Sequence, residues 1–166
     1  MDASLLALYQ NAAEASELNC WQLFGDSAGP ATLPAIEQAL HDPTALIRSA
    51  AARALRLSTD SDADRALASV LMHDTAPTVR ADAIFATQFR RPLPPLLTDA
   101  LLEVVNSDNS GFVRSDAIAV LSRNLTVSPR ISKALAQIAT TDPDPGIRRQ
   151  AKSAVATWST SASEGP

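Results

Sequence analysis

Two His-Asp pairs are the residues whose types and spacing come nearest to metal chemistry in this chain. They are His41-Asp42 and His73-Asp74, which stand 32 residues apart. Imidazole nitrogen and carboxylate oxygen are common protein ligands of zinc and iron. Each pair falls at the predicted end of a helix, where a histidine is also stabilised by the helix dipole without any ligand.

Two observations weigh against a metal site at these pairs. The same position further along the chain carries Ser107-Asp108 and Thr141-Asp142, which lack the imidazole. Neighbouring helices stack about 8–10 Å apart, whereas two nitrogens on one metal lie roughly 3–4 Å from each other. We therefore predict no metal and no cofactor.

No other catalytic motif is present in the sequence. It contains no phosphate-binding loop, no G-x-G-x-x-G, no G-x-S-x-G, no H-E-x-x-H and no C-x-x-C. The chain has two histidines and the single cysteine Cys20, so a Cys-His or Ser-His mechanism has little material. From these absences we predict that the protein is not an enzyme.

The His-Asp pairs belong to a fourfold repeat. Each apolar run ends in an Asp, a β-branched residue stands five residues later, and Arg follows it at the sixth, with spacings of 32, 34 and 34 residues between copies. A fixed period in this range is typical of a solenoid, whose units bury their apolar faces against one another. The repeated residues are Asp42, Arg48, Asp74, Arg80, Asp108, Arg114, Asp142 and Arg148.

Apolar periodicity predicts two helices, A and B, in each repeat. The A helices are expected at 31–41, 62–73, 95–107 and 129–140, and the B helices at 44–57, 76–89, 110–124 and 144–158. One domain over residues 1–158 would then comprise N-terminal capping helices in 1–26 and repeats at 31–57, 62–91, 95–124 and 129–158. Residues 159–166 read as a flexible tail.

The B helices share an apolar face. Counting from the repeated Arg, positions −1, +3 and +6 are apolar in every copy, and position +3 is always Ala. These offsets lie on one side of a helix. We predict that the alanines mark the closest approach of neighbouring helices. They are Ala51, Ala83, Ala117 and Ala151.

The paired helices joined by D-x4-[IV]-R resemble the HEAT repeat, especially the short bacterial HEAT-like repeats of the phycobilisome-lyase type. The resemblance covers about residues 31–158 and implies an all-α fold, a right-handed α-α superhelix of four to five antiparallel helix pairs. It also implies that each repeated Asp pairs with a repeated Arg in a ladder between repeats. Members of this family act mostly as scaffolds and adaptors.

Some HEAT-like families are enzymes, namely deoxyhypusine hydroxylases, alkylpurine DNA glycosylases and phycobilin lyases. The hydroxylases use repeated His-Glu pairs to hold iron, where this chain has two His-Asp pairs. A glycosylase requires aromatic side chains and an acid in a basic cleft, whereas only 4% of the residues in this chain are aromatic. An enzymatic function, as a lyase or with a metal, therefore ranks third among the alternatives.

Composition narrows the function further. The formal net charge is −4, which disfavours a uniformly basic nucleic-acid binder. The lone cysteine, the acidic start and the absence of a long apolar stretch predict a cytoplasmic protein without membrane segments.

Basic residues are concentrated on the predicted B helices, which usually line the concave side of a HEAT solenoid. Eleven of the 14 Lys and Arg residues lie there when the second span is extended to 91, which adds Arg90 and Arg91. We predict that this face binds a protein or peptide partner, with nucleic acid as the alternative. The candidate binding residues are Arg53, Arg56, Arg90, Arg91, Arg123, Arg149 and Lys152.

Overall fold

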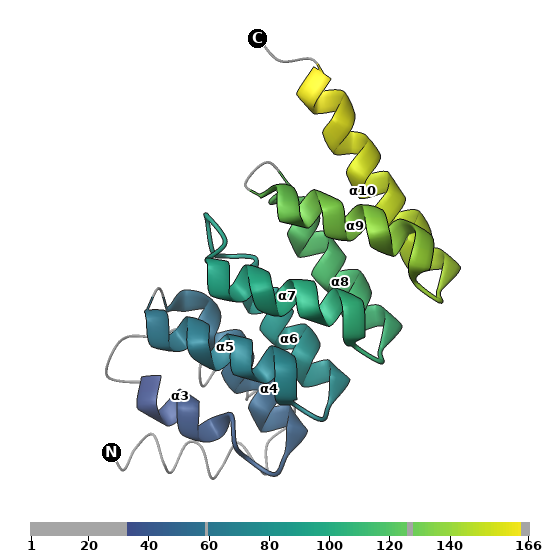
Figure 1. The fold of residues 1–166 in the computed structure, drawn as a ribbon. Helices are drawn as coiled ribbons and strands as arrows, with labels where there is room; N and C mark the ends of the chain where they lie inside the picture. Colours follow the sequence, from purple (N-terminus) through teal and green to yellow (C-terminus); the bar gives the residue numbers. More distant parts are fainter. Residues whose placement is uncertain (1–32, 59, 126–127, 164–166) are drawn as a thin grey trace. The chain divides into compact units, whose positions relative to one another are not determined.

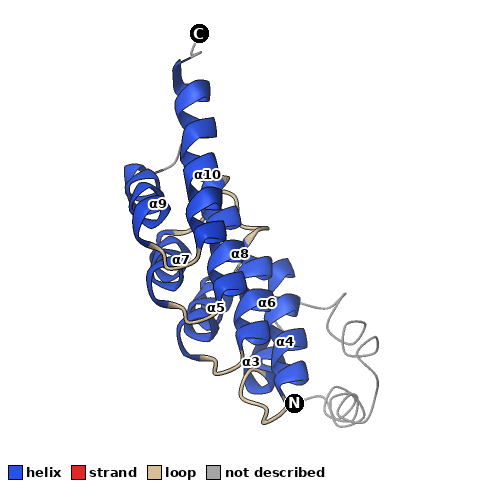
Figure 2. Cartoon of the chain, turned by 90° about the vertical axis from the view of Figure 1, so that its right-hand side faces the viewer, coloured by secondary structure: helices blue, strands red, loops and turns tan. Residues whose placement is uncertain are grey.

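The computed structural model describes residues 33–58, 60–125 and 128–163. All regular elements in these ranges are helices, as Figures 1 and 2 show. They are α3 (Leu33–Ala39), α4 (Ala45–Ala54), the 3-10 helix η1 (Leu55–Leu57), α5 (Ser61–His73), α6 (Pro77–Thr87), α7 (Pro95–Ser107), α8 (Gly111–Ser122), α9 (Pro129–Thr141) and α10 (Pro145–Ser163). The predicted all-α class is confirmed. The predicted capping helices of 1–26 lie outside the described residues.

The chain divides into two compact units, Met1–Arg91 and Pro92–Pro166. This division differs from the single domain over 1–158 that the repeat predicts. It falls in the segment Arg91–Pro95, where three of five residues are prolines and lack the N–H that continues a helix. In the first unit α3 and α5 are A helices and α4 and α6 are B helices; in the second, α7 and α9 are A and α8 and α10 are B.

Each helix pair is a hairpin whose turn is built by the repeated aspartate. The backbone N–H of Thr44, Ala76, Ser110 and Asp144 donates to the carboxylate of the Asp two residues earlier, over 2.7–2.9 Å. A carboxylate that accepts such a bond imitates a backbone turn. The Asp therefore follows the end of helix A and orients the residue that immediately precedes helix B in every repeat.

The B helices of each unit pack directly on one another. The alanines three residues after the repeated Arg are all fully buried, at 0% exposure. In the first unit α4 packs on α6, and in the second α8 packs on α10. The small alanine side chains are thus buried on helices that pack on one another, and their position at the closest helix approach stays a prediction.

Two helix ends differ from the sequence-based prediction. The α-helical part of α4 stops at Ala54 and continues to Leu57 as the 3-10 helix η1. At the other end of the chain α10 continues to Ser163, five residues into the predicted tail. The segment 159–163 contains no Gly or Pro, so nothing in its composition ends the helix at 158. No helix in the described ranges has the length and apolar content needed to cross a membrane.

Candidate functional site

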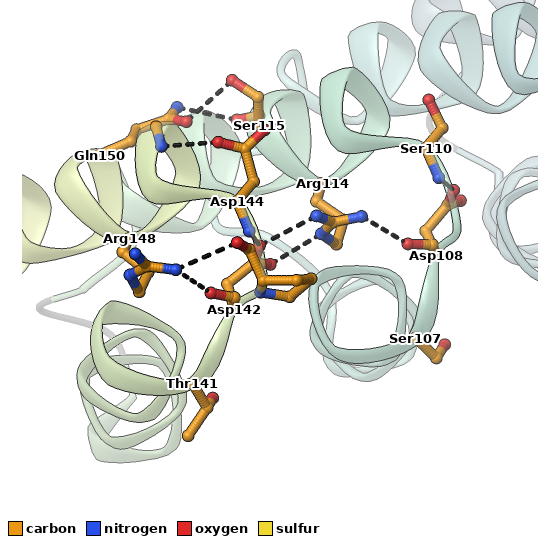
Figure 3. Close-up of polar contacts among 12 residues, drawn as sticks. Ser107, Asp108, Ser110, Arg114, Ser115, Thr141, Asp142, Asp144, Arg148 and Gln150 are labelled. Carbon is orange, nitrogen blue, oxygen red and sulfur yellow. Dashed lines mark hydrogen bonds and ion pairs between the residues drawn. The ribbon is translucent and has the colours of Figure 1, made fainter.

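The repeated Arg and Asp side chains meet between successive repeats of each unit. In the first unit Arg48 donates from Nε and Nη2 to the carboxylate of Asp74, over 2.7 and 3.0 Å. In the second unit Arg114 donates in the same way to Asp142, over 2.7 and 2.9 Å, as Figure 3 shows. This two-pronged geometry is the strongest form of an Arg-carboxylate pair.

The same arginines also hold their own turns. Nη1 of each repeated Arg donates to the carbonyl oxygen of the Asp six residues earlier, over 2.7–2.9 Å in all four copies. One guanidinium therefore binds the turn of its own repeat and, in the two pairs above, the carboxylate of the next. These residues act as part of the framework, with side chains of Asp142 and Asp74 only 2% and 5% exposed.

The two aspartates titrate at lower pH than an ordinary carboxyl. Burial alone would raise the pKa of Asp142, but the hydrogen bond from Arg114, the N–H of Asp144 and the nearby guanidinium charges outweigh it and lower the pKa. The pKa of Asp74 is lowered in the same way, against its burial, by Arg48, the N–H of Ala76 and the charge of Arg80. Both carboxylates are thus ionised and paired at neutral pH.

The candidate binding residues of the first unit differ in what they contact. Arg53 lies half-buried, donates to Asp82 over 2.7 Å, and places its guanidinium 4.1 Å from the centre of the Phe85 ring. Arg56 is half-buried and donates to the carbonyl of Arg53 over 3.3 Å. Arg91 is exposed.

Arg90, one of the candidate binding residues, is buried in the structure. Its side chain is 6% exposed; Nε donates to Asp64 over 2.7 Å, while Nη1 and Nη2 donate to the carbonyls of Arg56 and Leu55 over 3.1 and 3.0 Å. Those carbonyls belong to the 3-10 turn that ends α4, where helical partners are missing. Arg90 therefore fastens the ends of α4 and α6 and the start of α5, and does not face solvent.

The candidate residues of the second unit are exposed. They are Arg123, which follows α8, and Arg149 and Lys152 on α10. Their exposure agrees with a binding surface and equally with a solvated surface, so their role in binding stays a prediction.

An aromatic patch on α6 was not among the sequence-based candidates. Phe85 and Phe89 meet edge to face with ring centres 5.4 Å apart, and Phe89 is 55% exposed. With Arg53 and Asp82 they form what we call the Arg-Phe patch; Arg53 lies on α4, Asp82 and Phe85 on α6, and Phe89 just after α6. The i,i+4 spacing of the two rings is the sequence signal that predicts such a contact.

The His-Asp pairs line a groove between α3 and α5 of about 790 Å³. Both histidines are exposed, and Nδ1 of His73 donates to the carbonyl of Ser69 over 3.0 Å. Asp74 is already bound to Arg48. Within the described ranges no three His, Cys, Asp or Glu side chains form a group able to hold a metal ion.

The corresponding groove of the second unit, between α7 and α9, measures about 230 Å³ and is lined by Thr141, Asp142 and Arg114. Ser107 and Thr141 stand where the first unit has its two histidines (Figure 3). The grooves thus share the Arg-Asp framework and differ in the residues beside it.

Comparison with known proteins identifies the architecture. A family model of HEAT repeats matches residues 4–88. A solved structure described as the complex of CpcE and CpcF of phycocyanin lyase from Nostoc sp. PCC7120 contains a chain of similar fold, with a TM-score of 0.66 and 20% identity; the match covers 92% of this chain and 98% of that one. No curated protein sequence gives a significant match. At this identity the structural likeness shows the fold alone.

One prediction is overturned by this comparison. We predict from the missing motifs that the chain is not an enzyme, yet a chain of the same fold belongs to a phycocyanin lyase. The inference fails because motifs such as G-x-S-x-G mark only particular mechanisms. Their absence does not separate a HEAT-repeat adaptor from a HEAT-repeat subunit of a lyase.

Proposed function

Because this chain belongs to the HEAT-repeat family, we propose that it is a protein-binding module that holds a protein or peptide segment against its B helices. The observation that carries the proposal is that some basic residues are paired within the framework and others reach solvent. Arg48, Arg90 and Arg114 form buried or half-buried ion pairs within the framework. Five other cations on the B helices and their ends reach solvent. Those five are Arg56, Arg91, Arg123, Arg149 and Lys152.

The distribution of charge in the first unit supports the same face. Between residues 33 and 91, the A helices and their turns carry six carboxylates and one arginine, while the B helices and their ends carry six arginines and one carboxylate. An acidic partner segment is therefore attracted to the B side and repelled by the A side. Such complementarity sets the orientation and speed of association more than its strength.

A lyase-related role is a second candidate, supported by the fold shared with the phycocyanin lyase complex. That structure is described as a complex of two proteins, so a partner chain fits this role as well as the first. The test is to incubate the chain, alone and with any protein that it captures, with phycocyanin and to follow the absorbance spectrum of the pigment protein. An unchanged spectrum under both conditions would remove this candidate.

Affinity capture with the whole chain tests the proposed function. Proteins retained from a host lysate are identified, purified and titrated against the chain and against Arg56→Glu with Arg91→Glu. We expect the double reversal to weaken binding of the purified partner by about tenfold or more, since two attractive charge pairs become repulsive. The matched control is Arg65→Glu, an exposed arginine on α5 of the A layer.

Nuclease treatment separates protein binding from nucleic-acid binding. If the purified partner no longer binds after nuclease treatment, nucleic acid occupies the B helices and the proposed function is wrong. The proposal also fails if the purified partner binds the double reversal and the wild type with equal affinity.

A further inference from the structure

The Arg-Phe patch is the most exposed aromatic surface of the described part of the first unit. Phe89 is 55% exposed, although the transfer of a phenyl ring out of water is favourable. It stands just beyond the last residue of α6, on the same side of that helix as Asp82 and Phe85, which precede it by seven and four residues. Phe and Arg are among the residue types enriched at protein–protein interfaces.

The patch is pre-organised by contacts within the unit. The guanidinium of Arg53 is held at one end by the carboxylate of Asp82 and lies over the ring of Phe85. The Phe85 and Phe89 rings meet edge to face, so Phe89 has one aromatic neighbour within the unit. Residues already held in their bound arrangement lose little conformational entropy on binding, which is a property of interface hot spots.

Arg56 and Arg91 are both linked to the end of α6, Arg56 through Arg90 and Arg91 through the chain. Arg90 binds the carbonyls of Leu55 and Arg56, so the 3-10 turn that carries Arg56 is fastened beside the end of α6. Phe89 and the exposed Arg91 stand on either side of Arg90 in the chain. An apolar side chain at Phe89 would therefore have guanidinium groups close to it, and its flanking residues would favour Asp and Glu.

A nucleic acid fits these contacts less well than a protein. Three arginines of the first unit's B layer, Arg48, Arg53 and Arg90, already donate to carboxylates, so they are less available for the phosphate contacts that dominate nucleic-acid affinity. Single-stranded nucleic acid stacks successive bases on aromatic faces, and one face of Phe85 is covered by Arg53. A single exposed ring offers an anchor for one side chain.

We propose that the Arg-Phe patch binds an acidic protein segment that places one apolar side chain against Phe89 and carboxylates beside Arg56 and Arg91. This inference rests on the proposed function, because it names the surface and the chemistry of the partner. It requires no contribution from the second unit.

A peptide selection on the whole chain tests this inference. A phage-displayed library of random dodecapeptides is selected on the wild-type protein, and enriched clones are titrated by fluorescence anisotropy against Phe89→Ala and Phe112→Ala. Phe112 is the matched control, because it is 50% exposed on α8 of the other unit. Thermal melts of both variants check that folding is unchanged.

We expect enriched clones to be rich in Asp and Glu and to carry an apolar residue. Phe89→Ala should weaken their binding by about tenfold or more, as for a hot-spot residue, and Phe112→Ala by less than about twofold. The inference is overturned if no clone is enriched, if the clones are not acidic, or if both variants weaken binding alike. Displacement of the clones by an oligodeoxythymidylate would make nucleic acid the occupant and overturn it as well.

Two further results separate this inference from the proposed function. If the purified partner depends on Arg56 and Arg91 but binds Phe89→Ala normally, the proposed function stands and the Arg-Phe patch is not the site. If sedimentation shows self-association that Phe89→Ala abolishes, a second copy of the chain occupies the patch and the inference is wrong. Failure of both capture and selection removes both proposals.

Discussion

Arg114 donates two hydrogen bonds to the carboxylate of Asp142, one repeat further along the chain, and a third to the carbonyl of Asp108 in its own repeat. A single side chain therefore connects two turns. The carboxylate of Asp142 in turn accepts the N–H of Asp144 at the start of α10. This relationship explains why both residue types recur at a fixed distance: either one alone would leave a buried charge without its partner.

Removal of one partner of this pair should be costly. In Asp142→Ala the guanidinium of Arg114 stays buried without a carboxylate, and we expect the free energy of unfolding to fall by about 3 kcal/mol. Urea denaturation followed by circular dichroism measures the loss. The matched control is Asp99→Ala, which breaks the Arg130–Asp99 pair of the same unit, whose side chains are 69% and 55% exposed. That loss should stay below about 1 kcal/mol, and equal losses would contradict a framework role for the ladder.

The same pair should make stability depend on pH. The folded pKa of Asp142 is lowered, so the unfolded chain takes up this proton first as pH falls. The stability that the ionised Asp142 carboxylate contributes is fully present above the pKa of the unfolded chain, about 3.9. It is lost as pH falls through the folded pKa. The difference in unfolding free energy between wild type and Asp142→Asn should therefore be largest at neutral pH and narrow below about pH 4. A difference that stays constant with pH would show that the carboxylate charge contributes nothing.

Substitution by alanine should destabilise the protein at Arg90 and have almost no effect at its neighbour Arg91. Arg90→Ala removes three donors and leaves Asp64 without its partner, so we expect a loss of about 3 kcal/mol in unfolding free energy. Arg91→Ala alters an exposed side chain and should change it by less than about 0.5 kcal/mol. Chemical denaturation of both variants provides the measurement. If the two values are similar, Arg90 does not fasten the ends of α4 and α6.

The alanine at the closest helix contact sets a fourth prediction. Ala117 is fully buried on α8, and Ala117→Leu should lower the unfolding free energy by roughly 1–3 kcal/mol because the helices cannot separate without losing other contacts. Ala136→Leu is the control, since that alanine is exposed on α9. A thermal melt compares the two. An unchanged melting temperature for Ala117→Leu would refute the close approach.

The helix pairs were predictable because the same physical requirement is repeated four times. Asp must end helix A and Ala must fit the helix contact in each copy, so these residues recur in phase at Asp108 and Ala117 as they do at Asp42 and Ala51. The ends of α4 and α10 were less predictable, because no strong breaker follows Ala54 or Trp158.

Individual site residues were harder to predict, since spacing does not show where a long side chain ends. Arg90 follows α6 in the chain, where a cation suits the helix dipole, and its fold back onto Leu55 depends on the 3-10 turn. Arg53 and Phe85 lie 32 residues apart and meet only because α4 packs on α6. Sequence alone marks such residues as basic or aromatic and leaves their contacts open.

Site-specific photo-cross-linking in the host cell tests the central claim, that the B helices hold a protein partner, most directly. A benzophenone amino acid is placed at Phe89 on the B side or at Ser69, an exposed residue of α5 on the A side. We predict a protein adduct from position 89 that resists nuclease, and little or none from position 69. Adducts from position 69 alone, or a nucleic-acid adduct at position 89, would contradict the claim.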